Sequence, residues 1–258
     1  MPIDFHNEDN RSTYSSREAD ISWTKKILKI CEVKDKKVLD MGCGGGIYSK
    51  AFAHMGAASV TGIDFSQQLL SSARENCKSY ANIHFYLGDV LNTRLEEKQY
   101  DIILSRAVIH HLSDLNSCFS EIFRLLKPDG ICLIQDRTPE DCLLEGSPTH
   151  IRGYFFAKYP SLINKEISRR YTSNVVTQAL QTVGFDDIEE HYLWETRKKY
   201  TSKEELTADL LNRTGRSILH ELNDKQLKAL VEYIQLHLNN NEEIIEKDRW
   251  TIWKAIKM

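Results

Sequence analysis

The stretch from residue 38 to residue 46 reads Val38-Leu39-Asp40-Met41-Gly42-Cys43-Gly44-Gly45-Gly46. An apolar run stops there at an acid and four glycines, and residues 47–53 resume with helical spacing. This order predicts a strand, a tight turn and a helix. Glycine permits positive φ and leaves the backbone open to a ligand, and the amides at a helix N-terminus bind polar groups. The stretch therefore predicts a ligand site on an α/β sheet.

The glycine spacing separates two kinds of nucleotide site. A dinucleotide-binding turn has the pattern G-x-G-x-x-G. Counted from Gly42, the third glycine would fall at Ile47. Counted from Gly44, it would fall at Ser49, so the pattern fails in both registers. The acid at the strand end, Asp40, would repel a pyrophosphate and favours a cationic ligand.

The stretch resembles the acid-x-Gly-x-Gly-x-Gly motif of the class I S-adenosylmethionine (SAM)-dependent methyltransferases, matched at Asp40, Gly42, Gly44 and Gly46. The resemblance implies that SAM binds with its cationic end near Asp40 and its aminoacyl part along the backbone of residues 42–46. It also implies a Rossmann-like α/β fold, in which a seven-stranded, mostly parallel sheet of order 3-2-1-4-5-7-6 carries helices on both faces.

Other expected strands also end in polar residues. Strand 59–64 ends at Asp64, strand 83–87 is followed by Asp89, and strand 100–105 ends at Ser105. Ligands of parallel sheets lie at the carboxyl ends of the strands, so these residues should meet. Asp64, about twenty residues beyond the glycine turn, can accept hydrogen bonds from both ribose hydroxyls of an adenosine. NAD proteins use the same geometry, so Asp64 indicates adenosine rather than SAM specifically.

The resemblance assigns the remaining cofactor contacts. Asp89 and Val90 would hold the adenine, and the carbonyls of Ser105 and Arg106 would meet the ammonium group. The expected cofactor-binding residues are Asp40, Gly42, Cys43, Gly44, Asp64, Phe65, Asp89, Val90, Ser105 and Arg106.

The segment after strand four contains His110 and His111. A histidine near the methyl donor can deprotonate a hydroxyl or amine acceptor, and we expect His110 to be this catalytic base while His111 packs. Displacement from a sulfonium needs alignment and exclusion of water, and no metal-ligand spacing is visible in the sequence. We therefore expect no metal ion in the site.

Composition limits the partners and the location. The chain has 258 residues, 41% of them hydrophobic, and a net charge of −3, which argues against nucleic acid as the main partner. Six scattered cysteines without C-x-x-C or zinc spacing favour reduced thiols. The sequence shows neither a signal-peptide core nor an apolar run long enough to span a bilayer. We expect a cytoplasmic protein without membrane contact.

Two segments depart from the family pattern. We expect a single domain over 1–258, with a lid at 137–171 after strand five and a helical insertion at 197–248 before the last strand. In the lid, Arg152 and Tyr154 are expected to contact the acceptor. The insertion would complete either the acceptor pocket or a subunit interface in a homodimer. A capping box at Ser15 predicts a leading helix to about residue 30, where Tyr14 or Arg17 would close over the cofactor.

The sequence as a whole predicts methyl transfer from SAM to a small-molecule acceptor. It does not fix the acceptor or whether oxygen, nitrogen or carbon is methylated. Strand four ends in Ser-Arg-Ala-Val rather than Asn-Pro-Pro-Tyr, which disfavours nucleobase amines. Two alternatives stay open: an NAD(P)-dependent oxidoreductase, which the glycine spacing disfavours, and a non-catalytic SAM-binding regulatory protein.

Overall fold

The computed structural model describes residues 18–238 and 243–258. Contacts between residues divide the described chain into two compact units. The first, here called the sheet unit, comprises residues 18–136, Ser173–Leu193 and Thr251–Met258. The second, the helical unit, comprises Arg137–Thr172 and the described part of Trp194–Trp250. We describe each unit by itself.

The strands form one mixed sheet whose order is the one expected from the sequence. In spatial order they are β3 (Ile83–Leu87), β2 (Ser59–Asp64), β1 (Lys37–Met41), β4 (Tyr100–Arg106), β5 (Leu126–Asp136), β7 (Ile244–Lys257) and β6 (Phe185–Tyr200). Strands β3 to β5 are parallel, and β7 pairs with β5 in the antiparallel direction. The parallel register places Met41 beside both Ile63 and Ser105, so the carboxyl ends of β1, β2 and β4 share one edge.

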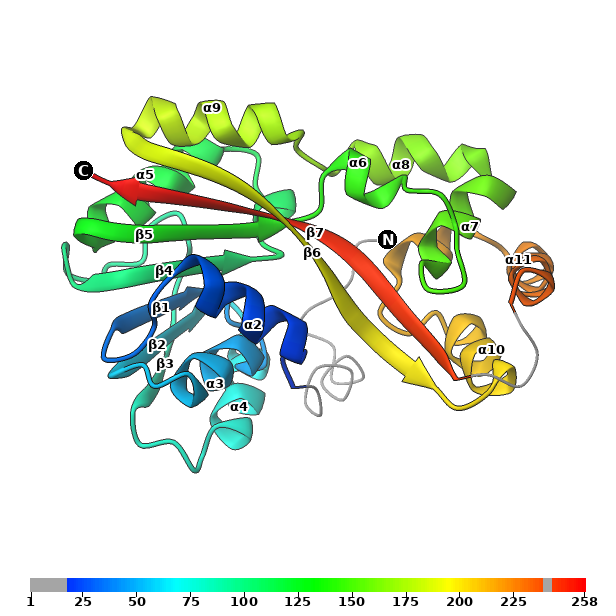
Figure 1. Cartoon of the computed structure of the whole chain (residues 1–258), viewed down its shortest axis with the longest axis horizontal. Helices are drawn as coiled ribbons and strands as arrows, with labels where there is room; N and C mark the ends of the chain where they lie inside the picture. The colour runs from blue at the N-terminus through cyan, green and yellow to red at the C-terminus, as the bar shows by residue number, and fades with distance from the viewer. Residues whose placement is uncertain (1–17, 239–242) are drawn as a thin grey trace. The chain divides into compact units, whose positions relative to one another are not determined.

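Helices cover both faces of this sheet (Figure 1), with α5 and α9 on one side and α2, α3 and α4 on the other. Their bounds are α2 (Ile21–Ile30), α3 (Ile47–His54), α4 (Gln67–Asn76), α5 (Leu115–Leu125) and α9 (Ser173–Val183). A short 3-10 turn, η2 (Ile109–His111), follows β4. The arrangement buries both faces, as a parallel sheet requires.

The leading helix begins later than expected. Asp20 caps α2 by accepting a hydrogen bond from the Ser22 amide at 3.0 Å, and residues 18–20 are not helical. The helix expected to open near Ser15 was therefore placed too early, and Ser15, Tyr14 and Arg17 lie outside the described residues. The Trp23 indole of α2 is fully buried and donates to Gln135 Oε1 at 2.7 Å, which anchors the helix to β5.

Strand β5 also differs from the expectation. The sequence of residues 127–130, Lys-Pro-Asp-Gly, predicts a turn before the strand, yet β5 already begins at Leu126. The register shifts between Tyr100 and Ile102 of β4, and Asp129 has φ of 61°. The proline and glycine therefore produce an irregular strand entry instead of a separate turn.

The helical unit contains both segments that depart from the family pattern. Its elements are α6 (Pro139–Cys142), α7 (Ile151–Lys158), η3 (Pro160–Leu162), α8 (Ile163–Ile167), α10 (Lys203–Leu211), η4 (Ser217–Glu221) and α11 (Asp224–Leu236). One apolar core joins Phe155 of α7 to Leu206 of α10 and Leu230 of α11. The apolar face of α11, formed by Leu227, Leu230, Val231 and Ile234, is buried in it. The expectation of one domain with two additions stays a prediction, although contacts place both additions in one unit.

Two strands run through both units. The sequence pattern predicts strands at 188–194 and 250–256, and the structure extends them to Phe185–Tyr200 (β6) and Ile244–Lys257 (β7). Most of the added residues, 195–200 and 244–249, belong to the helical unit. Within residues 18–238 and 243–258, none of the helices has the length and apolar character that a membrane crossing requires.

Candidate functional site

The glycine loop after β1 is fixed by backbone hydrogen bonds to β2. The amides of Gly42 and Cys43 both donate to the Ile63 carbonyl, at 2.8 and 2.9 Å. Gly42, Gly44 and Gly46 have φ of 79°, 51° and 78°, the left-handed region that glycine adopts without strain. The loop thus connects the end of β1 directly to the first turn of α3.

The glycines serve different purposes. A Cβ built on Gly42 would lie 2.3 Å from Val108 Cγ2, so Gly42 allows close packing against the segment that follows β4. A Cβ on Gly44 would meet no atom within 4 Å among those described. Gly44 therefore faces open space, where a ligand can approach the bare backbone.

Asp64, at the end of β2, holds this loop from its other side. Its Oδ2 accepts from the Gly44 amide and its Oδ1 from the Ser66 amide, both at 2.9 Å. Burial raises the pKa of the carboxyl group, although these hydrogen bonds oppose the rise. Each carboxylate oxygen has further lone pairs, so Asp64 can still accept from a ligand hydroxyl.

Asp40 is the second buried carboxyl group of the site. It accepts a hydrogen bond of 2.6 Å from the Ser49 hydroxyl of α3. Burial raises the pKa of Asp40 to about 6, and the negative charge of Asp64 adds to the rise, while the Arg106 charge opposes it. Burial disfavours the ionised form of both acids, so a positive ligand would stabilise the site.

The end of β4 adds a hydroxyl group and a guanidinium group. The Ser105 Oγ is buried and has no hydrogen-bond partner among the described residues. Such an atom usually marks a place for a ligand or water. The Arg106 guanidinium lies over the Tyr48 ring, 4.2 Å from its centroid.

The turn after β3 carries the residues expected to hold adenine. Asp89 is exposed and accepts from the Leu91 amide at 2.9 Å, and Val90 is half-buried. The Gly88 amide donates to the Asp64 carbonyl at 3.1 Å, which ties this turn to the end of β2. Phe65 is 58% exposed, so its ring is available as an apolar surface beside Asp64.

His110 is held by a carboxylate that the sequence analysis did not select. Its Nδ1 lies 2.8 Å from Oδ2 and 3.0 Å from Oδ1 of Asp136, the last residue of β5. The His111 ring contacts the His110 ring at a tilt of 45°, with centroids 4.0 Å apart. The rule that selected Asp40 and Asp64, an acid at a strand end, applies equally to Asp136.

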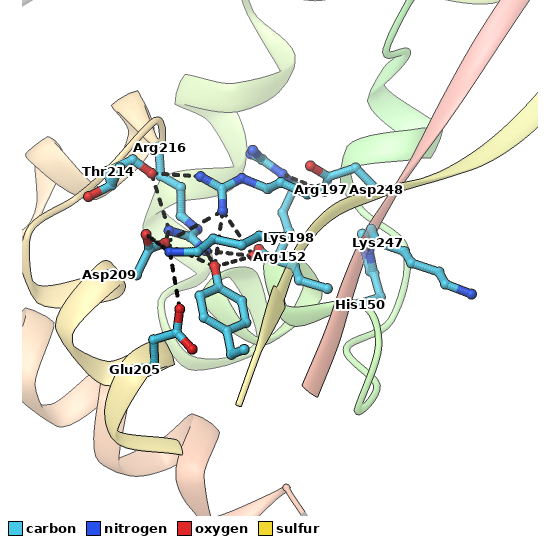
Figure 2. Close-up of polar contacts among 12 residues, drawn as sticks. His150, Arg152, Arg197, Lys198, Glu205, Asp209, Thr214, Arg216, Lys247 and Asp248 are labelled. Carbon is cyan, nitrogen blue, oxygen red and sulfur yellow. Dashed lines mark hydrogen bonds and ion pairs between the residues drawn. The ribbon is translucent and has the colours of Figure 1, made fainter. Parts of the chain in front are cut away.

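Arg152 and Tyr154 belong to the helical unit. Arg152 is 6% exposed and lies 3.5 Å from Glu166 and 3.4 Å from Asp248 (Figure 2 shows Arg152 and Asp248). Tyr154 is buried in the apolar core, with its ring 5.0 Å from that of His237. Both side chains are engaged within their own unit, and their contact with the acceptor stays a prediction.

Ionic contacts of the helical unit form a buried network. Burial alone would raise the pKa of Glu166, but the charges of Arg152, Arg170 and Arg137 lower it to about 2.

Within residues 18–238 and 243–258 no group of three or more histidine, cysteine or acidic residues is arranged to hold a metal ion.

Comparison with known proteins identifies the family. Residues 32–191 match the family described as "Methyltransferase domain". The chain belongs to the methyltransferase domain family. The sheet order is that of the class I SAM-dependent methyltransferases, as the sequence predicted.

Curated relatives of this methyltransferase-family chain match about half of its length or less. The chain is 31% identical over 132 residues to a demethylmenaquinone methyltransferase of Staphylococcus saprophyticus, covering 48% of this chain and 56% of that protein. It is 36% identical over 105 residues to a ubiquinone biosynthesis O-methyltransferase of Haemophilus ducreyi, covering 38% and 44%. The chain thus spans about half the length of the curated relatives it matches.

Solved structures share the fold over a longer stretch. The chain resembles phosphoethanolamine N-methyltransferase 2 of Haemonchus contortus in complex with SAM, with TM-score 0.61 and 20% identity over 99% of this chain and 60% of that one. The YcgJ protein of Bacillus subtilis gives TM-score 0.61 and 20% identity over 91% and 97%. At this identity the likeness concerns the fold alone.

Proposed function

We propose that this methyltransferase-family chain transfers a methyl group from SAM to a small-molecule acceptor. The observation that carries the proposal is the pair of buried carboxyl groups, Asp40 and Asp64, beside a glycine loop that is open at Gly44. SAM carries a sulfonium and an ammonium group, and a site with two disfavoured negative charges suits such a ligand. The unpartnered Ser105 hydroxyl supports a polar ligand at the same edge.

The residues at this edge take the following roles in the proposal. Asp64 accepts from the ribose hydroxyls, and Asp89 with Val90 receives the adenine. Asp40 lies toward the cationic end, where the carbonyls of Ser105 and Arg106 accept from the ammonium group. The amides of Gly42, Cys43 and Gly44 line the aminoacyl part, and Phe65 covers the adenosine.

SAM supplies a methyl group on a sulfonium, which is already a good leaving group. The protein's part is then to align the acceptor and exclude water. His110 serves as the base that takes the acceptor's proton. Relatives named for menaquinone and ubiquinone biosynthesis support a small organic acceptor.

Binding and transfer are tested separately. Calorimetry should detect binding of SAM and S-adenosylhomocysteine, while NADH should show no quenching of its fluorescence on titration. Incubation with methyl-labelled SAM and a metabolite panel should then yield labelled small molecules. Binding of NADH in place of SAM would support the oxidoreductase alternative, and SAM binding without any transfer would support a regulatory protein.

The partners and location complete the proposal. A net charge of −3 supports a small molecule rather than nucleic acid as the partner, and we place the protein in the cytoplasm without membrane contact. The helical insertion at 197–248 would contribute to the acceptor pocket or form the interface of a homodimer. Light scattering after size exclusion decides the latter, because a monomeric mass contradicts the dimer.

A further inference from the structure

Asp136 contacts both the side chain and the backbone of His110. Both oxygens lie within 3.0 Å of the His110 Nδ1, and Oδ2 also accepts from the His110 backbone amide at 3.3 Å. The Asp136 side chain is 3% exposed and the imidazole 17% exposed. One buried group therefore fixes both the ring and the 3-10 turn that carries it.

This geometry determines where the neutral imidazole carries its proton. A carboxylate only accepts hydrogen bonds, so the proton of the neutral ring lies on Nδ1. The lone pair is then on Nε2, the nitrogen that does not contact Asp136. An imidazole held in this tautomer is ready to accept a proton at Nε2.

The dyad lies beside the proposed cofactor site. His110 is two residues beyond Val108, whose methyl group fills the space above Gly42. Asp136 ends β5 at the same edge of the sheet where β1 ends in the glycine loop. Both residues and the loop belong to the sheet unit.

We propose that Asp136 is the positioning residue that holds His110 as a proton acceptor at Nε2, and that the group methylated is a hydroxyl of the acceptor. The inference rests on the proposed function. A neutral amine attacks through its own lone pair, and a free thiol, with a pKa of about 8.5, is already partly ionised near neutral pH. A hydroxyl group is a poor nucleophile until a base removes its proton, which is what this oriented imidazole provides.

The step balances with SAM as the co-substrate. The hydroxyl proton passes to Nε2, and the oxygen forms the bond to the methyl carbon. The bond between that carbon and sulfur breaks, and its electron pair stays on sulfur. The products are the methyl ether, S-adenosylhomocysteine and a protonated His110, which returns its proton to solvent.

The tautomer is measured directly, without catalysis. Long-range ¹H–¹⁵N spectra of the uniformly ¹⁵N-labelled protein with S-adenosylhomocysteine should show neutral His110 with Nδ1 protonated and Nε2 bare, the signal being assigned with His110→Gln. In Asp136→Asn the signal should shift toward a mixture of tautomers. A proton on Nε2 in the wild-type protein, or an unchanged spectrum in the variant, overturns the role of Asp136.

Activity gives a second readout with a matched control. Asp136→Asn should lower transfer from SAM to a small-molecule extract of bacterial cells by about 10- to 100-fold, while SAM affinity stays within about twofold. Asp114→Asn is the control, because exposed Asp114 caps α5 and asparagine caps equally well. Equal activity of both variants would contradict the proposal.

The methylated atom is identified with SAM carrying a ¹³C-methyl group and the same extract. The ¹³C chemical shift of the transferred methyl group distinguishes attachment to oxygen from attachment to nitrogen, sulfur or carbon. Methyl ethers are expected, and any other attachment overturns the hydroxyl assignment. A protein that binds SAM and methylates nothing in the extract contradicts the proposed function itself, whereas the histidine spectrum still decides the role of Asp136.

Discussion

At the scale of single residues, the site contains buried acids whose ionised form is disfavoured by their burial. Asp40 is buried and its pKa is raised to about 6, first by burial and further by the charge of Asp64. A cationic ligand binds the ionised form of Asp40 and lowers its pKa again, so ligand binding and proton release are linked. Ionised Asp40 therefore destabilises the site when it is empty, and would stabilise it when a cationic ligand is bound.

SAM affinity should therefore depend on pH. Asp40 is mostly ionised at pH 7 and mostly protonated at pH 5. The dissociation constant for SAM should therefore rise by about tenfold as the pH falls from 7 to 5. Calorimetry at pH 5, 6 and 7 measures the change. Asp40→Asn should bind more weakly at pH 7 and show a flat profile, and a wild-type profile that is equally flat would contradict the role of Asp40.

Two glycines of one loop should respond differently to the same substitution. Gly42→Ala places a methyl group 2.3 Å from Val108 in a left-handed conformation, and should cost about 1–3 kcal/mol of unfolding free energy. Gly44→Ala meets no neighbouring atom, so it should cost less stability and mainly weaken SAM binding. Urea unfolding and calorimetry compare the pair, and the reverse order would show that Gly44 does not face the ligand.

At the scale of elements, one buried network organises the helical unit. Tyr200 at the end of β6 accepts from Arg216 at 2.9 Å, and Arg216 donates to Glu246 of β7 at 2.6 Å. Arg216 also pairs with Asp209 of α10, whose pKa falls to about 2 because this pairing outweighs the effect of burial. Figure 2 shows Arg197 and Lys198 of β6, Asp209 of α10 and Arg216, which precedes η4, converging on one another.

Removing the central guanidinium should be costly. Arg216→Met leaves the buried acids Asp209 and Glu246 without their main partner, and should lower the unfolding free energy by about 3–5 kcal/mol. Lys165→Met breaks the surface pair with Glu221 and is the control, for which we expect little change in the urea midpoint. Equal midpoints for the two variants would show that the network is not structural.

The sheet unit could be predicted from local signals, whereas the helical unit could not. Acids and glycines at the ends of β1, β2 and β3, and the polar Ser105 at the end of β4, identified these strands and the residues around them, because these patterns depend on neighbours in sequence. Asp136 also ends a strand and could have been selected by the same rule, but its pairing with His110, 26 residues away, could not be predicted from local spacing. The common core of the lid and the insertion depends on contacts between residues as distant as Phe155 and Leu230.

At the scale of the whole molecule, acids in the two units contribute to stability with opposite dependence on pH. Glu166 in the helical unit has a pKa lowered to about 2, so its stabilisation is present above about 4.5 and is lost as pH falls through 2. Asp40 in the sheet unit has a pKa raised to about 6, so the wild-type protein loses stability as pH rises from 3.8 to 6.

Two variants should reveal these opposite signs. Glu166→Gln should be less stable than wild type by on the order of 3 kcal/mol at pH 7 and should approach it near pH 2. Without ligand, Asp40→Asn should be more stable by on the order of 3 kcal/mol at pH 7, with no difference below pH 4. Urea unfolding across this pH range measures both, and differences of the same sign would contradict the assignment.

Because β6 and β7 each run through both units, the helical unit is not an appendage joined by a single hinge. Moving it onto another methyltransferase would take four splice points, after residues 136, 172, 193 and 250, two of them inside continuous strands. A chimaera would have to keep the alternation of inward and outward side chains across those junctions. The helical unit would thus be altered more readily by substitution within it than by its wholesale exchange.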